Sequence, residues 1–116
     1  MLFLPENELH ELGLLFYHYL ARKIGYQTYY LGQCVPYNDI KVVYEVHRPH
    51  VMITSMTSNP SPQELNDYLF MLSQDFSKVR ILAAGILLKR TSFTFPSNLK
   101  VFDTAMELKS ILKDLS

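Results

Sequence analysis

Short apolar segments alternate with amphipathic segments along this chain, and that alternation constrains the fold more than any other feature. Strands are predicted at residues 1–4, 26–31, 51–54, 79–83 and 100–102. Helices are predicted at 9–24, at 37–47, from about Ser61 onward, and from a Thr104 cap to about Leu115. Strands that alternate with helices form a parallel sheet, and right-handed crossovers then place helices on both of its faces.

Each predicted helix has an apolar face that we expect to pack on the sheet. The first helix ends at Gly25, and the Gly32–Pro36 segment that follows the second strand is predicted to be a loop. The expected inward residues are Leu12, Leu15, Phe16, Tyr19, Leu20 and Ile24; Ile40, Val43, Tyr44 and either Val46 or His47; Leu65, Tyr68, Leu69 and Leu72; and Leu108, Ile111, Leu112 and Leu115.

Length and charge restrict the functional classes. The 116 residues suit one domain, spanning 1–116, and no linker divides them. A formal net charge of zero argues against a broad basic surface for nucleic acid. The single cysteine, Cys34, excludes an internal disulfide and a cysteine-based zinc site. No apolar run approaches the ~20 residues that span a bilayer, and no signal peptide is evident, so we expect a cytoplasmic protein without membrane contact.

The segment from Leu4 to Gly13, L-P-E-N-E-L-H-E-L-G, carries the main candidate site. His10 follows the first predicted strand, and in open α/β sheets the crevice beyond the strands' carboxyl ends is where ligands bind. Glu8 could accept the other ring N–H of His10, which would fix the tautomer and raise the basicity of a metal-ligating nitrogen. These residues alone leave open whether His10 is a ligand or an ordinary surface histidine.

The E-L-H-E-L-G run resembles the D-x-H-x-x-G motif of cobalamin-binding domains, with Glu8 in place of the aspartate. Two further family elements follow in register. Ser55-Met56-Thr57 stands for Ser-x-Leu, with 41 residues between it and Gly13, and Ala84-Gly85 stands for Gly-Gly after another 26 intervening residues. Thr57 in place of leucine and Ala84 in place of glycine depart from the family pattern, and both fall where the cofactor's tail would bind.

The chain is most similar to the C-terminal cobalamin-binding domains of MerR-type transcriptional regulators. These favour E-x-H-x-L-G and a later L-G-x-x-x-P, which is here Leu31 to Pro36. The resemblance implies an α/β fold, a flavodoxin/Rossmann-like five-stranded parallel sheet with helices on both faces.

The resemblance also implies a set of cofactor contacts. His10 would ligate cobalt from below the corrin ring, and the displaced dimethylbenzimidazole tail would enter a slot beside the first, third and fourth strands. The adenosyl or methyl form of cobalamin is left open, and no catalytic residue is implied, so we expect a binding protein rather than an enzyme. The expected cofactor-binding residues are Glu8, His10, Gly13, Ser55, Thr57, Ala84 and Gly85.

By the same resemblance, the chain is expected to be part of a longer regulator. An N-terminal helix-turn-helix domain would bind DNA, a helical bundle would cover the upper corrin face, and the parent protein would self-associate. Two alternatives stay open. One is a degenerate domain that keeps the fold as a dimerisation or interaction module without cofactor. The other is a corrinoid carrier subunit of an enzyme.

Overall fold

One parallel sheet organises the computed structural model, which describes residues 1–5, 11–56, 62–84 and 95–115. Within these ranges the strands lie in the order β2-β1-β3-β4-β5, and every neighbouring pair is parallel. The predicted fold class and the flavodoxin-like strand order are therefore confirmed. The strands are β1 (Leu2–Pro5), β2 (Tyr30–Val35), β3 (Val51–Ser55), β4 (Arg80–Ala84) and β5 (Leu99–Phe102).

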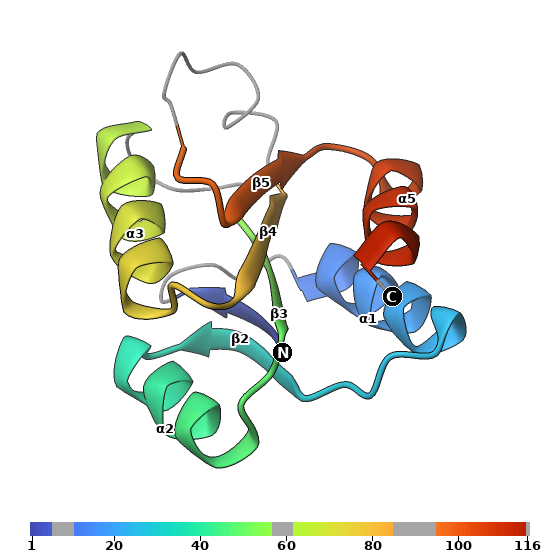
Figure 1. Cartoon of the computed structure of the whole chain (residues 1–116), viewed down its shortest axis with the longest axis horizontal. Coiled ribbons are helices and arrows are strands. Elements are labelled where there is room, and N and C mark those ends of the chain that lie inside the picture. The colour runs from blue at the N-terminus through green and yellow to red at the C-terminus, as the bar shows by residue number, and fades with distance from the viewer. Residues whose placement is uncertain (6–10, 57–61, 85–94, 116) are drawn as a thin grey trace.

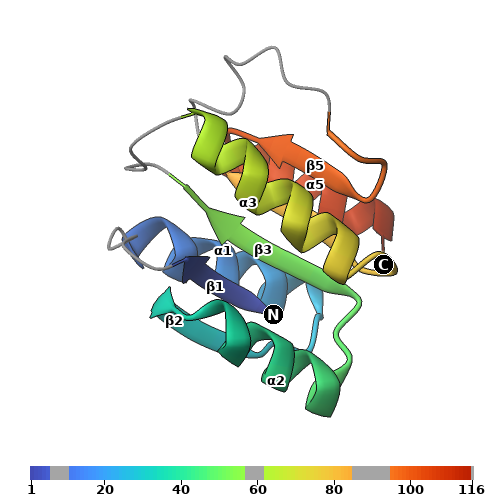
Figure 2. The ribbon, with the colours of Figure 1, turned by 90° about the vertical axis from the view of Figure 1, so that its left-hand side faces the viewer.

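Helices cover both faces of the sheet (Figure 1). Figure 2 looks onto one face of the sheet, with α2 and α3 in front of the strands and α1 and α5 behind them. Helices α1 and α5 lie on one face, and α2 and α3 lie on the other. The helices are α1 (Glu11–Ile24), α2 (Tyr37–His47), α3 (Pro62–Asp75) and α5 (Ala105–Leu115). No helix in the described ranges is long and apolar enough to cross a membrane.

Successive residues of each central strand enter opposite cores. In β1, Phe3 packs in the core under α2 and α3, whereas Leu2 and Leu4 pack under α1 and α5. In β3, Met52 packs in the core under α2 and α3, and Ile53 packs in the core under α1 and α5. Strands buried on both faces read as continuous apolar runs, which is why these segments were recognisable from the sequence.

Local signals placed most helix ends correctly. Helix α2 begins directly after Pro36 and ends before Arg48, which adopts a left-handed conformation with φ 46°. At the start of α5, the Glu107 backbone N–H donates to Thr104 Oγ1 over 3.1 Å, so the predicted Thr104 cap is confirmed. In α2 and α5 the expected burial failed near the helix ends, where Val46, His47 and Leu115 are exposed.

Two expectations for the second strand were wrong. Tyr26 to Tyr29 precede β2 instead of forming it, and the segment expected to be a loop, Gly32 to Val35, belongs to the strand. Gly32 has φ 87° and Cys34 has φ 54°, and the register with β1 is irregular. A glycine inside a strand often marks a bulge, and here it was misread as a loop signal.

The expected inward face of α1 was also largely wrong. Leu14 and Ala21 are buried against the sheet and α5, whereas most of the residues expected inside are exposed. The helix carries apolar residues on two sides, and the sequence pattern alone did not show which side the sheet covers. The exposed residues are Leu12, Leu15, Phe16 and Tyr19.

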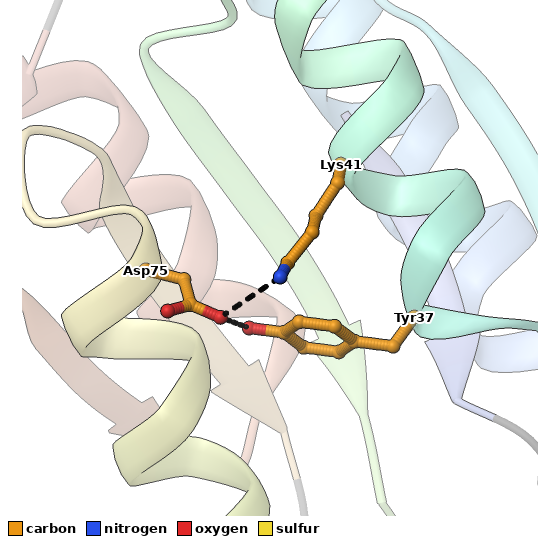
Figure 3. A network of polar contacts seen from close by, with 3 residues as sticks. All are labelled: Tyr37, Lys41 and Asp75. Atoms are coloured by element: carbon orange, nitrogen blue, oxygen red, sulfur yellow. Dashed lines mark hydrogen bonds and ion pairs between the residues drawn. The ribbon is translucent and has the colours of Figure 1, made fainter.

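A polar cluster joins α2 to α3 on the outside of their shared core (Figure 3). The Tyr37 hydroxyl donates to Asp75 Oδ2 over 2.7 Å, and Lys41 Nζ lies 3.7 Å from the same oxygen. Burial, followed by the hydrogen bond and charge of Asp75, raises the pKa of Tyr37, so the phenol stays a donor. The Tyr37 ring also packs against Phe76, and it therefore ties the start of α2 to the end of α3.

His18 fastens α1 to the segment that leads into β2. Its Nε2 shares a 2.8 Å hydrogen bond with Thr28 Oγ1, and its ring stacks on Tyr30 with centroids 4.8 Å apart. Burial, and then the positive charge of Arg22, lowers the pKa of His18 below its ordinary 6.5. Protonation of His18 therefore favours the unfolded chain.

We expect the contribution of His18 to the free energy of unfolding to be fully retained above about pH 6.5 and to be lost as the pH drops below that value. The unfolded chain binds more protons in this range. Urea unfolding between pH 7.5 and 5 would show a smaller loss for His18→Gln than for the unchanged chain. His50→Gln removes the imidazole of an exposed histidine instead and serves as the control. An unchanged slope in His18→Gln would contradict the assignment.

Candidate functional site

The carboxyl ends of the central strands bring two of the expected site residues together. Ser55 ends β3 and Ala84 ends β4, and the two are register partners. The pairing continues one residue further, because the Met56 N–H donates to the Ala84 carbonyl over 2.9 Å. Strand β1 lies on the other side of β3. Ser55 and Ala84 therefore lie side by side at this edge of the sheet.

Both residues belong to the face of the sheet that α1 and α5 cover. Ala84 packs in the core under these helices, and Ser55 lies two residues beyond Ile53, which packs in the same core. The side chains are small and nearly enclosed, with 8% of Ser55 and 3% of Ala84 exposed. Their hydroxyl and methyl groups lie on the face of the sheet that α1 covers.

Gly13 lies in the first turn of α1, at the same edge. A Cβ built on it would meet only the Tyr17 hydroxyl, at 3.9 Å, which is an ordinary contact. Packing within the described chain thus gives no reason for a glycine at this helical position, where alanine is intrinsically favoured. A missing Cβ also lets a ligand approach the backbone closely.

Two aromatic residues that the sequence did not single out border this part of the core. Tyr17 and Phe102 meet edge to face, with ring centroids 5.2 Å apart. Burial raises the pKa of the Tyr17 phenol above its usual range. Their role was missed because Tyr17 belongs to the α1 face that was expected to point outward, and Phe102 read only as a strand residue.

The L-G-x-x-x-P segment reaches the same edge from β2. Val35 is the register partner of Pro5, at the end of β1. A Cβ on Gly32 would lie 3.7 Å from Glu11 Oε2, which accepts a 2.7 Å hydrogen bond from the Tyr30 hydroxyl. The segment therefore contacts the first turn of α1, directly after the E-L-H run.

Four expected site residues, Glu8, His10, Thr57 and Gly85, lie outside the described residues. Their positions and contacts stay predictions. Among the residues that the structure does describe, no cluster of three or more His, Cys, Asp and Glu side chains offers a site for a bare metal ion.

A cavity of about 280 Å³ lies at the opposite edge of the sheet. Residues 26–29, which precede β2, and 47–51, which lead from the end of α2 into β3, supply much of its lining. It lies at the amino ends of the strands, away from Ser55 and Ala84, and is therefore separate from the candidate site.

Comparisons with known proteins give fold relatives only. No family model matches the chain, and no curated protein matches it. Solved structures do. A novel cobalamin-binding protein from Desulfitobacterium hafniense DCB-2 matches 73% of this chain with a TM-score of 0.63 and 18% identity. The methanol:cobalamin methyltransferase complex MtaBC from Methanosarcina barkeri matches 98% with a TM-score of 0.75 and 19% identity.

The chain spans 42% of the first matched structure's chain and 44% of the second's. At such low identity the likeness shows the shared fold alone. It places this chain among five-stranded parallel α/β domains of the kind found in these two proteins.

We expect Gly13→Ala to raise the free energy of unfolding by up to about 1 kcal/mol, because alanine is the better helix former and its methyl meets only Tyr17 Oη. Urea denaturation of the two proteins measures the change. A large destabilisation would mean that the glycine serves the fold and would remove the argument for ligand approach.

Proposed function

We propose that this chain is a cobalamin-binding domain in which His10 ligates cobalt and the nucleotide tail enters beside β1, β3 and β4. The observation that carries the proposal is the pairing of Ser55 with Ala84 at the carboxyl edge of the sheet. Gly13, whose missing Cβ no described contact explains, lies at the same edge. Each of the three sequence motifs thus has at least one residue in the described ranges, and these residues lie at the same edge of the sheet. Two structures of the same fold are titled as cobalamin proteins.

The described residues suit such a ligand. The Ser55 hydroxyl is available to hydrogen-bond a polar atom of the tail, and the short side chains of Ser55 and Ala84 leave room near the sheet. Gly13 would let the corrin approach the backbone of α1. Because Ser55 is only 8% exposed, a ring that reaches it must displace some of the groups that enclose it.

The remaining roles rest on residues outside the described ranges. His10 would give one axial nitrogen to cobalt, and Glu8 would accept its other ring N–H. Thr57 and Gly85 would border the tail with Ser55 and Ala84. Bound cobalamin would supply a reactive upper cobalt ligand, while the chain would bind and orient the cofactor without catalysing a reaction itself.

We further propose that the domain is the sensor part of a MerR-type transcriptional regulator. The E-x-H-x-L-G form of the first motif and the L-G-x-x-x-P segment support this context. Gly32 of the second motif lies close to Glu11, so the two motifs meet in space. DNA binding would belong to a separate N-terminal domain, and the parent protein would self-associate.

A corrinoid carrier subunit is the second candidate. It is favoured by the match over 98% of the chain to the methanol:cobalamin methyltransferase complex. Such a subunit would present its cofactor to a methyltransferase partner. Copurification with a methyltransferase would support the carrier, whereas cofactor-dependent binding of the full-length protein to DNA would support the regulator.

Absorbance titration with hydroxocobalamin and with adenosylcobalamin in the dark tests the proposal. We expect shifted corrin bands for the unchanged chain and loss of the shift in His10→Ala, because the imidazole replaces the benzimidazole at cobalt. His50→Ala, at the opposite edge of the sheet, is the matched control and should titrate normally. Absence of any shift at near-millimolar cofactor would instead identify a degenerate interaction module.

We expect Ala84→Gly to bind cobalamin more tightly than the unchanged chain, because it removes the methyl group that narrows the slot beside Ser55. The apo-domain should lose about 1–2 kcal/mol of stability, from strand glycine and from lost apolar burial. Parallel titrations and urea unfolding separate the two effects. Weaker binding by the folded variant would show that the Ala84 methyl contacts the ligand favourably.

A further inference from the structure

The outward side of α1 carries an apolar surface that the fold does not use. We call Leu12, Leu15, Phe16 and Tyr19 the α1 stripe. Their exposed fractions are 82%, 45%, 49% and 56%. Single exposed apolar residues are normal, but four at the i, i+3, i+4, i+7 spacing form one continuous helix face.

The stripe is not a displaced part of the core. Leu14 and Ala21 are already buried on the sheet-facing side, where Tyr17 and Ile24 pack around them. The helix thus makes its intramolecular contacts with the side opposite the stripe. The stability of this domain alone therefore does not explain why the outward side of α1 is apolar.

The stripe is also ordered by contacts of its own. The Phe16 and Tyr19 rings stack with centroids 6.5 Å apart and an interplanar angle of 19°. Lys23 Nζ lies 5.7 Å from the centre of the Tyr19 ring. Stacked aromatic rings with a cation at the margin give a flat, rigid surface, which loses little side-chain entropy when it is covered.

The charges at the two ends of α1 indicate what covers it. Glu11 lies in the first turn, and Arg22 and Lys23 lie in the last. Glu11 and Arg22 are 11 residues apart, about three turns, and so lie on the same flank of the helix. If a second α1 packs antiparallel, each Glu11 faces the Arg22 of the other copy. A parallel pair would place Glu11 level with the Glu11 of the other copy and would form no such ion pair.

We propose that two copies of this chain associate through the α1 stripe, with their α1 helices antiparallel about a two-fold axis near Phe16 and Tyr17. Such an interface is isologous: both copies contribute the same surface patch, and the Glu11–Arg22 ion pair forms twice. The Tyr30 hydroxyl donates to Glu11 Oε2 and orients this carboxylate, which can accept further hydrogen bonds. The proposal does not depend on cobalamin binding.

Disulfide trapping tests the orientation. In a Cys34→Ser background, Phe16→Cys should form a covalent dimer under mild oxidation, because the two-fold axis brings both copies of position 16 together. Leu12→Cys should not pair with itself, because nine residues of axial offset separate the copies by about 13 Å, beyond disulfide reach. Val46→Cys, on the exposed side of α2, is the control and should stay monomeric.

Sedimentation analysis tests the association itself. We expect a dimer for the unchanged chain and a roughly tenfold or greater rise in the dimer dissociation constant for Phe16→Ser. Val46→Ser should leave the dimer intact, and Leu15→Ser repeats the test at a second stripe position. Circular dichroism confirms that each variant is folded.

Three results would overturn the proposal. One is a monomeric unchanged chain at concentrations up to about 1 mM. The second is a dimer that survives both stripe substitutions. The third is efficient self-cross-linking of Leu12→Cys, which would indicate a parallel arrangement.

Discussion

The pairing of β1 with β3 is the constraint on which the rest of this structure depends. The chain leaves β1 toward β2 on one side and leaves β3 toward β4 on the other. Right-handed crossovers then send α1 to one face of the sheet and α2 and α3 to the other, and the connections diverge at the point where open α/β sheets generally bind their ligands. Ser55 and Ala84 lie together because β3 and β4 pair directly up to this edge of the sheet.

The sequence predicted those parts of the fold that local chemistry decides. Pro36 and Pro62 set the starts of two helices, and buried β-strands read as apolar runs. The sequence-based predictions failed where two local structures were equally acceptable and tertiary packing decided between them. The α1 helix could have buried either apolar side, and Gly32 could have begun a loop or a bulge. The same limit applies to the site. Motif spacing located Ser55 and Ala84, but nothing in the pattern indicated that Tyr17 would border them.

The two edges of the sheet differ in how they satisfy polar groups. At the amino ends, the Asn98 side-chain amide donates to the carbonyls of Ser73, Phe76 and Val79 over 3.1–3.2 Å and closes the end of α3. Near the carboxyl ends, Thr54 Oγ1 is buried with no hydrogen-bond partner. Buried polar groups are seldom left unpaired. Among the described residues, a side-chain amide thus closes a helix end at the amino edge, and a buried hydroxyl near the carboxyl edge lacks a partner.

The left-handed residues Gly32 and Cys34 have a consequence for the outer margin of the sheet. Strand β2 forms one border, where exposed peptide groups can recruit strands from other molecules and start aggregation. Its irregular register breaks the flat ladder that such recruitment requires. At the opposite border, β5 has only four residues and carries the exposed Lys100. Both borders thus resist sheet extension, so encounters between copies of this chain are directed to helices rather than to strands.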